Sequence, residues 1–483
     1  MVNLRRRFCR IVCSVPSVLI AVTVIACACN VYHLIISSDI DTQYADANLV
    51  RSALRTYRKE EFIPGSQDSE QESWQSMEVK YKFKVLSYNV LSQQLLMSNP
   101  RLYRHHNPAH LNWSYRAPRL MDEFKTIDAD IICLQEVEAG HIPFYNELEK
   151  CGYKGIHKKR TGDKNDGCAI YFKTARFTLI DYTTVEFQQP EASVLDRDNI
   201  GLVVKLHPVG WDEFPLVVST THLLYNPKRH DVKLAQMQVL LTEIERFAYN
   251  SKFSYFTYHP IILTGDFNLQ PYTSVYQLLL SGSLRYDILD RKFLQMDAPS
   301  HFHMGKSLLS SRLGITDSCQ HYKILKVREL EDANGFVGSA KVQERLIGIQ
   351  NSDRNVHVSG IQVPDEDIYR FGSGVLSHGF NFKSVYNHAD SESREPEATT
   401  HHDEWVTVDY MLYTPLKNVS SNRDQLQLVS RMRLPTVTEC GKLGRIPNEA
   451  CPSDHIPLVA NFYLRLRKTD RHYDDRSNTR RKK

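Results

Sequence analysis

Four hydrophobic runs in this sequence end in acidic, amide or imidazole side chains. They are LSYNVLS with Asn89, IICLQEVE with Glu136, IILTGDFN with Asp266 and Asn268, and CPSDHIPL with Asp454 and His455. Each run has the length of a buried strand, and strands that stop at such groups present them together at one rim of a sheet. Oxygen and imidazole groups without a cysteine or serine nucleophile suit a hard cation such as Mg²⁺ and a water that attacks phosphorus. The pattern therefore predicts a phosphodiesterase site.

Size and composition allow a large globular domain with appendages. The chain has 483 residues, of which 42% are hydrophobic, and its 60 basic and 56 acidic residues give a formal net charge of +4. No global field therefore attracts nucleic acid, and any attraction for phosphate must be local. A basic tail over 466–483 is read either as a solvated terminus or as a contact for RNA or lipid.

The cysteines favour a reduced, intracellular catalytic domain. Cys133 and Cys168 lie inside apolar strand-like runs, where cysteine usually acts as a small buried hydrophobe. Cys440 and Cys451 flank a loop and have a spacing that permits a disulfide without establishing one. No Cys/His spacing in the sequence resembles a zinc site.

The N-terminal segment, residues 1–38, is arginine-rich and then mostly apolar, with no acidic residue before Asp39. It fits a signal-anchor helix, a cleaved signal peptide or a mitochondrial presequence. Its sustained hydrophobicity favours membrane attachment, at the endoplasmic reticulum or the mitochondrion, and the choice between them stays open. The anchor orientation given by the positive-inside rule would place the rest of the chain in a lumen, which fits poorly with an RNA substrate.

The remaining layout predicts one catalytic domain. Residues 39–78 are polar and are predicted to form a linker, and the domain itself spans 79–465. Strand-like and helix-like segments alternate to about residue 280, including an amphipathic helix over 234–247. The polar stretch 327–402 is predicted to be a partly disordered insertion between core strands.

Further segments carry a resemblance to a known family. Lys164-Asn165-Asp166-Gly167-Cys168-Ala169-Ile170, Asp198-Asn199-Ile200-Gly201 and Thr221-His222-Leu223-Leu224-Tyr225-Asn226-Pro227 join the four runs above. Together they resemble the endonuclease/exonuclease/phosphatase superfamily, and within it the deadenylase branch that includes nocturnin and the Angel proteins. The resemblance implies a four-layered α/β sandwich, in which two packed mixed β-sheets are flanked by helices and carry a metal site at one end.

The resemblance also implies roles for individual residues. Glu136 is the expected principal ligand of Mg²⁺, for which Mn²⁺ is a possible substitute, and Asp454 is expected to lie near the metal. Asn89 is expected to help hold either the metal shell or a phosphate oxygen. Asp266 is expected to orient or deprotonate the attacking water, and Asn268 to fix the phosphate.

Two histidines are expected to contact the phosphate. His455 is expected to be held in one tautomer by Asp409. His222 is expected to contact another phosphate oxygen or to protonate the leaving oxygen, and Asp166 is its suggested partner.

The substrate expected from the branch is a single-stranded RNA 3′ end. Asn199 is expected to contact a substrate phosphate, and Pro227 to pack against a base. Trp405 either replaces the aromatic residue that the branch carries before the strand of Asp409 or is displaced from that position. The acidic Glu404 beside Trp405 departs from the adenosine-binding pattern of the branch.

The leading hypothesis is a Mg²⁺-dependent 3′–5′ exoribonuclease or deadenylase. The alternatives are a phosphatase for RNA 2′,3′-cyclic phosphate ends, a phosphatase for small nucleotides or lipids, and a catalytically dead binding scaffold. A narrow site favours the cyclic phosphatase, whereas a groove for several nucleotides favours the exonuclease.

Overall fold

A computed structural model describes residues 59–63, 78–190, 192–250, 258–296, 303–333, 362–390, 393–401, 403–415 and 425–467. The predictions for the N-terminal segment and for nearly all of the basic tail lie outside these ranges. Within the ranges, no helix combines the length and the apolar character needed to cross a membrane.

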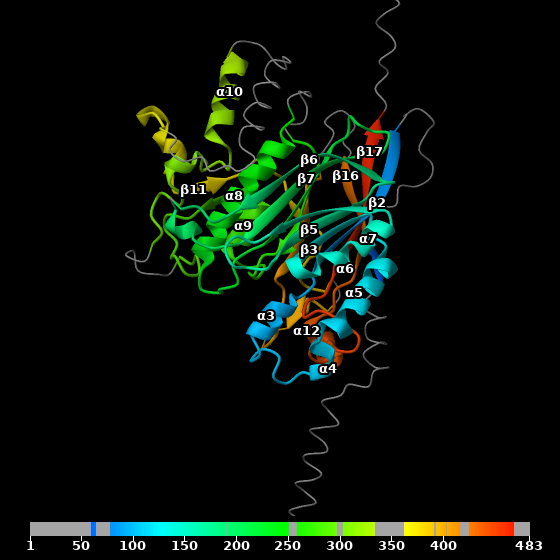
Figure 1. Ribbon diagram of the computed structural model, residues 1–483. Coiled ribbons are helices and arrows are strands. Elements are labelled where there is room, and N and C mark those ends of the chain that lie inside the picture. Colours follow the sequence, from blue (N-terminus) through cyan, green and yellow to red (C-terminus); the bar gives the residue numbers. More distant parts are fainter. Residues whose placement is uncertain are drawn as a thin grey trace, which may run out of the picture.

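Two mixed β-sheets form the centre of the molecule (Figure 1). In the order of their pairing, the seven strands of the first sheet are β1 (Glu60–Phe62), β16 (Leu426–Met432), β17 (Leu458–Arg467), β2 (Glu78–Asn89), β3 (Ile131–Glu138), β5 (Asp166–Lys173) and β4 (Tyr153–Lys159). The six strands of the second are β12 (Lys383–Ser384), β15 (Asp409–Tyr413), β9 (Ile261–Asp266), β8 (Leu216–His222), β7 (Ile200–Pro208) and β6 (Phe177–Glu186). The pairs β2–β3 and β8–β9 are parallel, and the other pairs are antiparallel.

Helices cover the outer face of each sheet (Figure 1). The first sheet is covered by α5 (Trp113–Ile127), α6 (Ile142–Tyr145) and α7 (Glu147–Lys150), and the second by α8 (His230–Ala248) and α9 (Ser274–Ser281). The remaining helices of the described residues are α3 (Gln93–Ser98), α4 (Pro108–Leu111), α10 (Tyr322–Ala333) and α12 (Val437–Leu443). The result is the predicted four-layered α/β sandwich.

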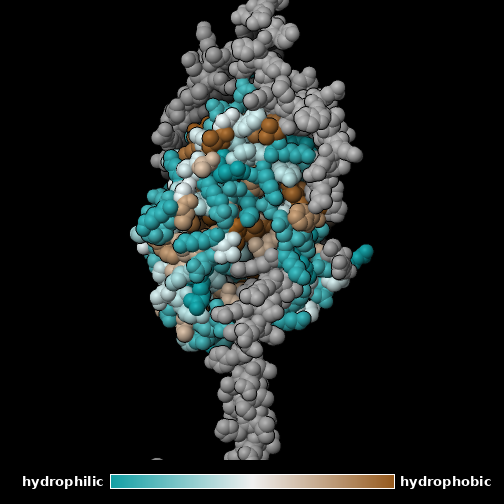
Figure 2. Space-filling view, turned by 90° about the vertical axis from the view of Figure 1, so that its right-hand side faces the viewer, coloured by the Kyte–Doolittle hydropathy of each residue, from teal (hydrophilic) through white to brown (hydrophobic). Residues whose placement is uncertain are grey.

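The central strands are apolar along their whole length because both faces of each sheet are covered. Val85 and Ile131 point into the core between the sheets, whereas their neighbours Leu86 and Ile132 pack beneath the helices of the first sheet. Successive side chains on a strand point to opposite faces, so continuous apolar runs are required here. On the face drawn in Figure 2, hydrophilic side chains predominate and hydrophobic ones form separate patches, which is ordinary for a folded surface.

Two boundary predictions need correction. Part of the predicted linker forms β1, where Glu61 pairs with Arg431 of β16 at 3.0 Å. This edge strand, with the sequence EEF, includes a charged contact, so its sequence lacks the apolar run that would predict a strand. The later part of the predicted insertion is also ordered: Phe380 and Phe382 are buried in the core beside α8 and α9, and β12 pairs with β15. Residues 334–361 of that insertion lie outside the described ranges.

The cysteine predictions divide in the same way. Cys133 and Cys168 are buried free thiols, as expected. Cys440 and Cys451 both remain thiols, so the permitted disulfide between them is not formed.

Gly265, the residue before Asp266, is required by a close backbone approach. Its φ is +149°, and a Cβ at this position would lie 2.1 Å from the carbonyl oxygen of Thr221 on β8. We expect Gly265→Ala to lower the free energy of unfolding by about 2 to 4 kcal/mol, because the parallel β8–β9 pair must separate. Urea titration followed by circular dichroism measures the change. Gly140→Ala is the matched control, since no atom lies within 4 Å of the added Cβ.

Candidate active site

The chemical groups predicted from the sequence meet where strands of both sheets end. Asn89 ends β2, Glu136 lies near the end of β3, His222 ends β8, Asp266 ends β9 and Asp409 begins β15. Asp266 faces His222 across one strand pair and Asp409 across the other, so three adjacent strands present these side chains together. Asp454 and His455 arrive from the loop before β17.

The side chain of Asn89 joins the two sheets. Its amide nitrogen donates to Glu136 Oε1 at 3.1 Å and to Asp266 Oδ2 at 3.0 Å. Its carbonyl oxygen accepts from the Leu91 backbone at 3.0 Å, which fixes the orientation of the amide. Asn89 therefore acts on the carboxylates of the site through hydrogen bonds.

Glu136 adopts an unusual backbone conformation. Its φ is +59°, and the register between β3 and β5 shifts between Gln135 and Val137. A β-bulge of this kind turns one side chain away from the regular alternation, and such strain is common at functional sites. The carboxylate thereby reaches the backbone nitrogen of Ser92, 2.9 Å from Oε2. Burial raises the pKa of Glu136; His222 lowers it, and the Asp454 carboxylate raises it further.

The predicted Asp409–His455 hydrogen bond is present, with Asp409 Oδ2 2.8 Å from His455 Nδ1. Burial by itself would lower the pKa of His455, but the carboxylates of Asp409, Asp454 and Asp266 together raise it well above the usual range. With Nδ1 held by Asp409, Nε2 lies 3.7 Å from Asp266 Oδ2. His455 is thus set to present a proton on Nε2 to an anion.

Asp266 is the shared centre of the site. Its Oδ2 lies 3.6 Å from His222 Nε2, while its Oδ1 accepts from the Asn268 backbone at 2.9 Å. Burial alone would raise the pKa of Asp266, but His222, His455 and the hydrogen bonds from Asn89 and Asn268 lower it. The carboxylate is therefore kept ionised although it is buried.

Asp454 is positioned by residues that the sequence did not single out. Tyr103 donates to Asp454 Oδ2 at 2.7 Å. Arg116 is fully buried on α5 and donates to the carbonyl oxygens of Val90 at 3.1 Å and Pro452 at 3.1 Å. It therefore ties the end of β2 to the loop that carries Asp454. Neither residue lies in an apolar run ending in polar groups or in a segment that carries the family resemblance, so the sequence did not mark them.

The donor set fits a divalent cation. Glu136, His222 and Asp266 each offer one ligand atom, and these atoms lie within 4.8 Å of one another. Asp454 Oδ1 is buried without a hydrogen-bond partner in the described part of the chain. Several buried carboxylates are costly unless a positive charge compensates them, and carboxylate oxygens are the ligands of hard cations.

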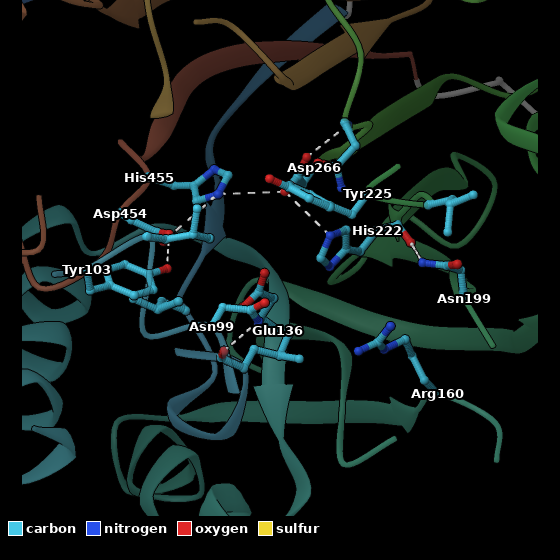
Figure 3. A pocket seen from close by; sticks show the side chains of 15 residues that line it. Asn99, Tyr103, Glu136, Arg160, Asn199, His222, Tyr225, Asp266, Asp454 and His455 are labelled. Carbon is cyan, nitrogen blue, oxygen red and sulfur yellow. Dashed lines mark hydrogen bonds and ion pairs between the residues drawn. The ribbon is translucent and has the colours of Figure 1, made fainter. Parts of the chain in front are cut away.

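A pocket of about 200 Å³ opens onto these groups. Figure 3 shows its polar side chains converging from several elements. The complete lining is Leu91, Leu95, Asn99, Leu102, Tyr103, Glu136, Arg160, Asn199, His222, Leu224, Tyr225, Asp266, Asn268, Asp454 and His455. Asn89 and Asp409 do not line the pocket but hydrogen-bond to side chains that do.

Of the three residues predicted to contact the substrate phosphate or base, one lines the pocket and two do not. Asn199 lines the pocket, but its amide donates to the His222 carbonyl at 3.0 Å and its oxygen accepts from Gln236 at 3.2 Å. Pro227 is exposed and Trp405 packs on the small cluster of Ala398, Cys440 and Leu443, so neither belongs to the pocket lining.

Asp166 requires a correction as well. It pairs with Arg160 instead of His222. Arg160 directly follows β4, which lies beside β5, whereas His222 is in the other sheet.

Two further lining residues, Arg160 and Tyr225, have no role that the sequence alone predicts. Arg160 sits in a basic run before the turn into β5, and Tyr225 lies inside the HLLYNP segment. Tyr225 is 56% exposed at the pocket. Their side chains had no distinguishing pattern, since charged and aromatic residues are common in surface loops.

The fold and the site define a member of a hydrolase family. The family model described as endonuclease/exonuclease/phosphatase matches residues 86–455, and the chain belongs to this family. Human protein angel homolog 2 is 37% identical over 407 residues, which cover 80% of this chain and 70% of the relative. Protein angel of Drosophila melanogaster is 29% identical over 386 residues, covering 79% of this chain and 80% of the relative.

A solved structure is similar across the same region. It is the crystal structure of ANGEL2, a 2′,3′-cyclic phosphatase, in complex with adenosine-2′,3′-vanadate. It is 35% identical to this chain, covers 84% of it and 98% of its own length, and has a TM-score of 0.65.

Glu136→Gln tests the proposed cation site directly. The change removes one negative charge at the centre of the donor set, and we expect the affinity for Mn²⁺ to fall roughly tenfold or more. Electron paramagnetic resonance of bound Mn²⁺ gives the affinity without a substrate. Glu149→Gln removes an exposed acid of α7 and serves as the control. Unchanged Mn²⁺ binding in Glu136→Gln would rule out Glu136 as a ligand.

Proposed function

We propose that this protein hydrolyses 2′,3′-cyclic phosphates at the 3′ ends of RNA. The observation that carries the proposal is the small pocket that ends at Glu136, Asp266 and His455. A 2′,3′-cyclic phosphate needs a 2′ oxygen, so it occurs on ribonucleotides alone. The similarity to ANGEL2, whose solved structure is titled a 2′,3′-cyclic phosphatase, supports the same substrate class.

The size of the pocket supports an end-recognising phosphatase over an exonuclease that grips several nucleotides. Its volume of about 200 Å³ is below the range of roughly 300 to 1,000 Å³ typical of drug-sized ligands. Such a site suits the ribose and phosphates of a single terminal nucleotide. Leu91, Leu95 and Leu224 give it apolar walls, which suit the sugar or base.

Charge stabilisation falls to the two histidines. His455, held by Asp409, donates from Nε2 to a non-bridging phosphate oxygen, and His222 donates to another or to the leaving oxygen. Hydrolysis adds water to phosphorus and breaks the bond to the 2′ or the 3′ oxygen. The released oxygen takes a proton and the product is a monoester.

Asp266 is suited to orient the attacking water. Its carboxylate is buried and ionised, and the amide nitrogen of Asn89 donates to its Oδ2 at 3.0 Å, which fixes its position. If Mg²⁺ or Mn²⁺ is held by the carboxylates of Glu136 and Asp454, which leaves the His222 imidazole free to donate, the ion would supply Lewis-acid stabilisation and make water a better nucleophile. No covalent intermediate is required, since no cysteine or serine lines the pocket.

The proposal is tested with 5′-labelled RNAs incubated with the full chain and Mg²⁺. One RNA ends in a 2′,3′-cyclic phosphate, one in poly(A) and one in mixed sequence with a free 3′ hydroxyl. Loss of the cyclic phosphate without shortening is the expected result. A ladder of shortened products would overturn the proposal in favour of the exoribonuclease hypothesis, and its dependence on adenosine would decide whether the enzyme is a deadenylase.

Asp409→Asn should lower kcat by about 10²- to 10⁴-fold with little change in KM, because His455 loses the partner that fixes its tautomer and its charge. Steady-state kinetics on the cyclic RNA end measure both constants. Thr407→Ser, near the start of the same strand, is the structural control: its hydroxyl donates to the Glu397 carbonyl at 2.7 Å, away from the pocket. An Asp409→Asn variant with normal kcat would contradict the assigned role of His455.

A further inference from the structure

Arg160 is a cation of the pocket that the mechanism above does not use. It is the one lysine or arginine among the residues that line the pocket, where three carboxylates also occur. In Figure 3 its guanidinium lies across the pocket from Tyr103 and Asp454 and turns toward the space between Glu136 and His222. Its position suits an anion that enters beside the reacting phosphate.

Asp166 holds the Nη2 side of the Arg160 guanidinium, and among the described residues Nη1 makes no hydrogen bond. Nη2 donates to Asp166 Oδ1, and the backbone nitrogen donates to the Asp166 carbonyl at 2.9 Å. The side chain is 13% exposed, and its Nε is buried without a hydrogen-bond partner in the described part of the chain. The Nε faces the same side as Nη2, where Asp166 Oδ2 is also buried without a partner, so the Nη1 edge is the one left for a ligand with an anionic oxygen.

Arg160 belongs to a different part of the pocket from the reacting groups. Among the described residues its ion pair is with Asp166, while His222 and His455 both approach Asp266. The pocket therefore has two positions for anionic oxygens. An RNA end with a 2′,3′-cyclic phosphate has a second phosphate close by, on the 5′ oxygen of the same terminal ribose.

We infer that Arg160 binds this 5′ phosphate, so that the pocket prefers RNA ends to nucleoside cyclic phosphates. The inference rests on the proposed function for the identity of the substrate. It assigns a specificity role to Arg160: the residue recognises that the cyclic phosphate belongs to a polynucleotide.

Two substrates that differ by one phosphate test the assignment. Adenosine 2′,3′-cyclic phosphate has the reacting group alone, and adenylyl-adenosine 2′,3′-cyclic phosphate adds the 5′ phosphate and one nucleoside. We expect Arg160→Gln to raise KM for the dinucleotide roughly 10- to 100-fold, the range of a charge-assisted hydrogen bond. KM for the mononucleoside and kcat for both substrates should stay within about twofold, since the reacting groups are unchanged.

Two variants control for indirect effects. Arg197→Gln removes an arginine that pairs with Asp196 and does not line the pocket, so it should leave both KM values unchanged. Asp166→Asn combined with Arg160→Gln removes the carboxylate left unpaired by the first change. If this double variant recovers the KM for the dinucleotide, the loss came from Asp166 and the inference is wrong.

A binding experiment separates this inference from the proposed function. Calorimetry with adenosine 5′-monophosphate and with adenosine needs no turnover. Arg160→Gln should weaken binding of the monophosphate alone. If wild-type protein hydrolyses neither cyclic substrate, the proposed function fails, and the binding result still decides the role of Arg160. Equal losses for both substrates, or no loss for either, would overturn the assignment to the 5′ phosphate.

Discussion

The hydrogen bonds from the amide of Asn89 are the contact on which the site depends. Asn89 and Glu136 belong to the first sheet and Asp266 to the second, and the amide nitrogen lies within 3.1 Å of both carboxylates. Packing of apolar faces is non-directional and sets the distance between two sheets only approximately. A buried side chain that donates to both sheets sets the position of the two carboxylates much more narrowly.

The buried carboxylates of the site explain why so many neighbouring residues donate hydrogen bonds to it. The site brings Glu136, Asp266, Asp409 and Asp454 together where each is at most 9% exposed. Carboxylates in such a place need donors, and Asn89, Tyr103, His455 and backbone nitrogens supply them. The same four carboxylates repel one another and create a negative potential that attracts a divalent cation. The arrangement that costs free energy on folding is therefore the one that suits the site to bind the cation.

The folded framework also limits what the pocket can accept. Arg116 ties the end of β2 to the loop before β17, and Asp166 ties Arg160 to β5. The pocket beside these contacts has a volume of about 200 Å³, which suits the end of an RNA chain. The choice between a cyclic phosphatase and an exonuclease is therefore a question of pocket shape, because the reacting groups serve both reactions.

The sequence by itself determined the buried strands and most of the reacting groups. Continuous apolar runs that end in polar residues identify β2, β3 and β9 and place Asn89, Glu136 and Asp266 at one rim, since strand direction fixes where a run ends. The four layers followed from the family resemblance, and His455 lies in the loop before β17 instead of ending a strand. Only the tertiary structure decided their partners. The pairing of Asp166 with Arg160, the position of Trp405 away from the pocket and the support from Arg116 depend on which segments lie beside one another in space. No local pattern encodes such contacts, because each joins residues whose neighbours in the sequence are unrelated.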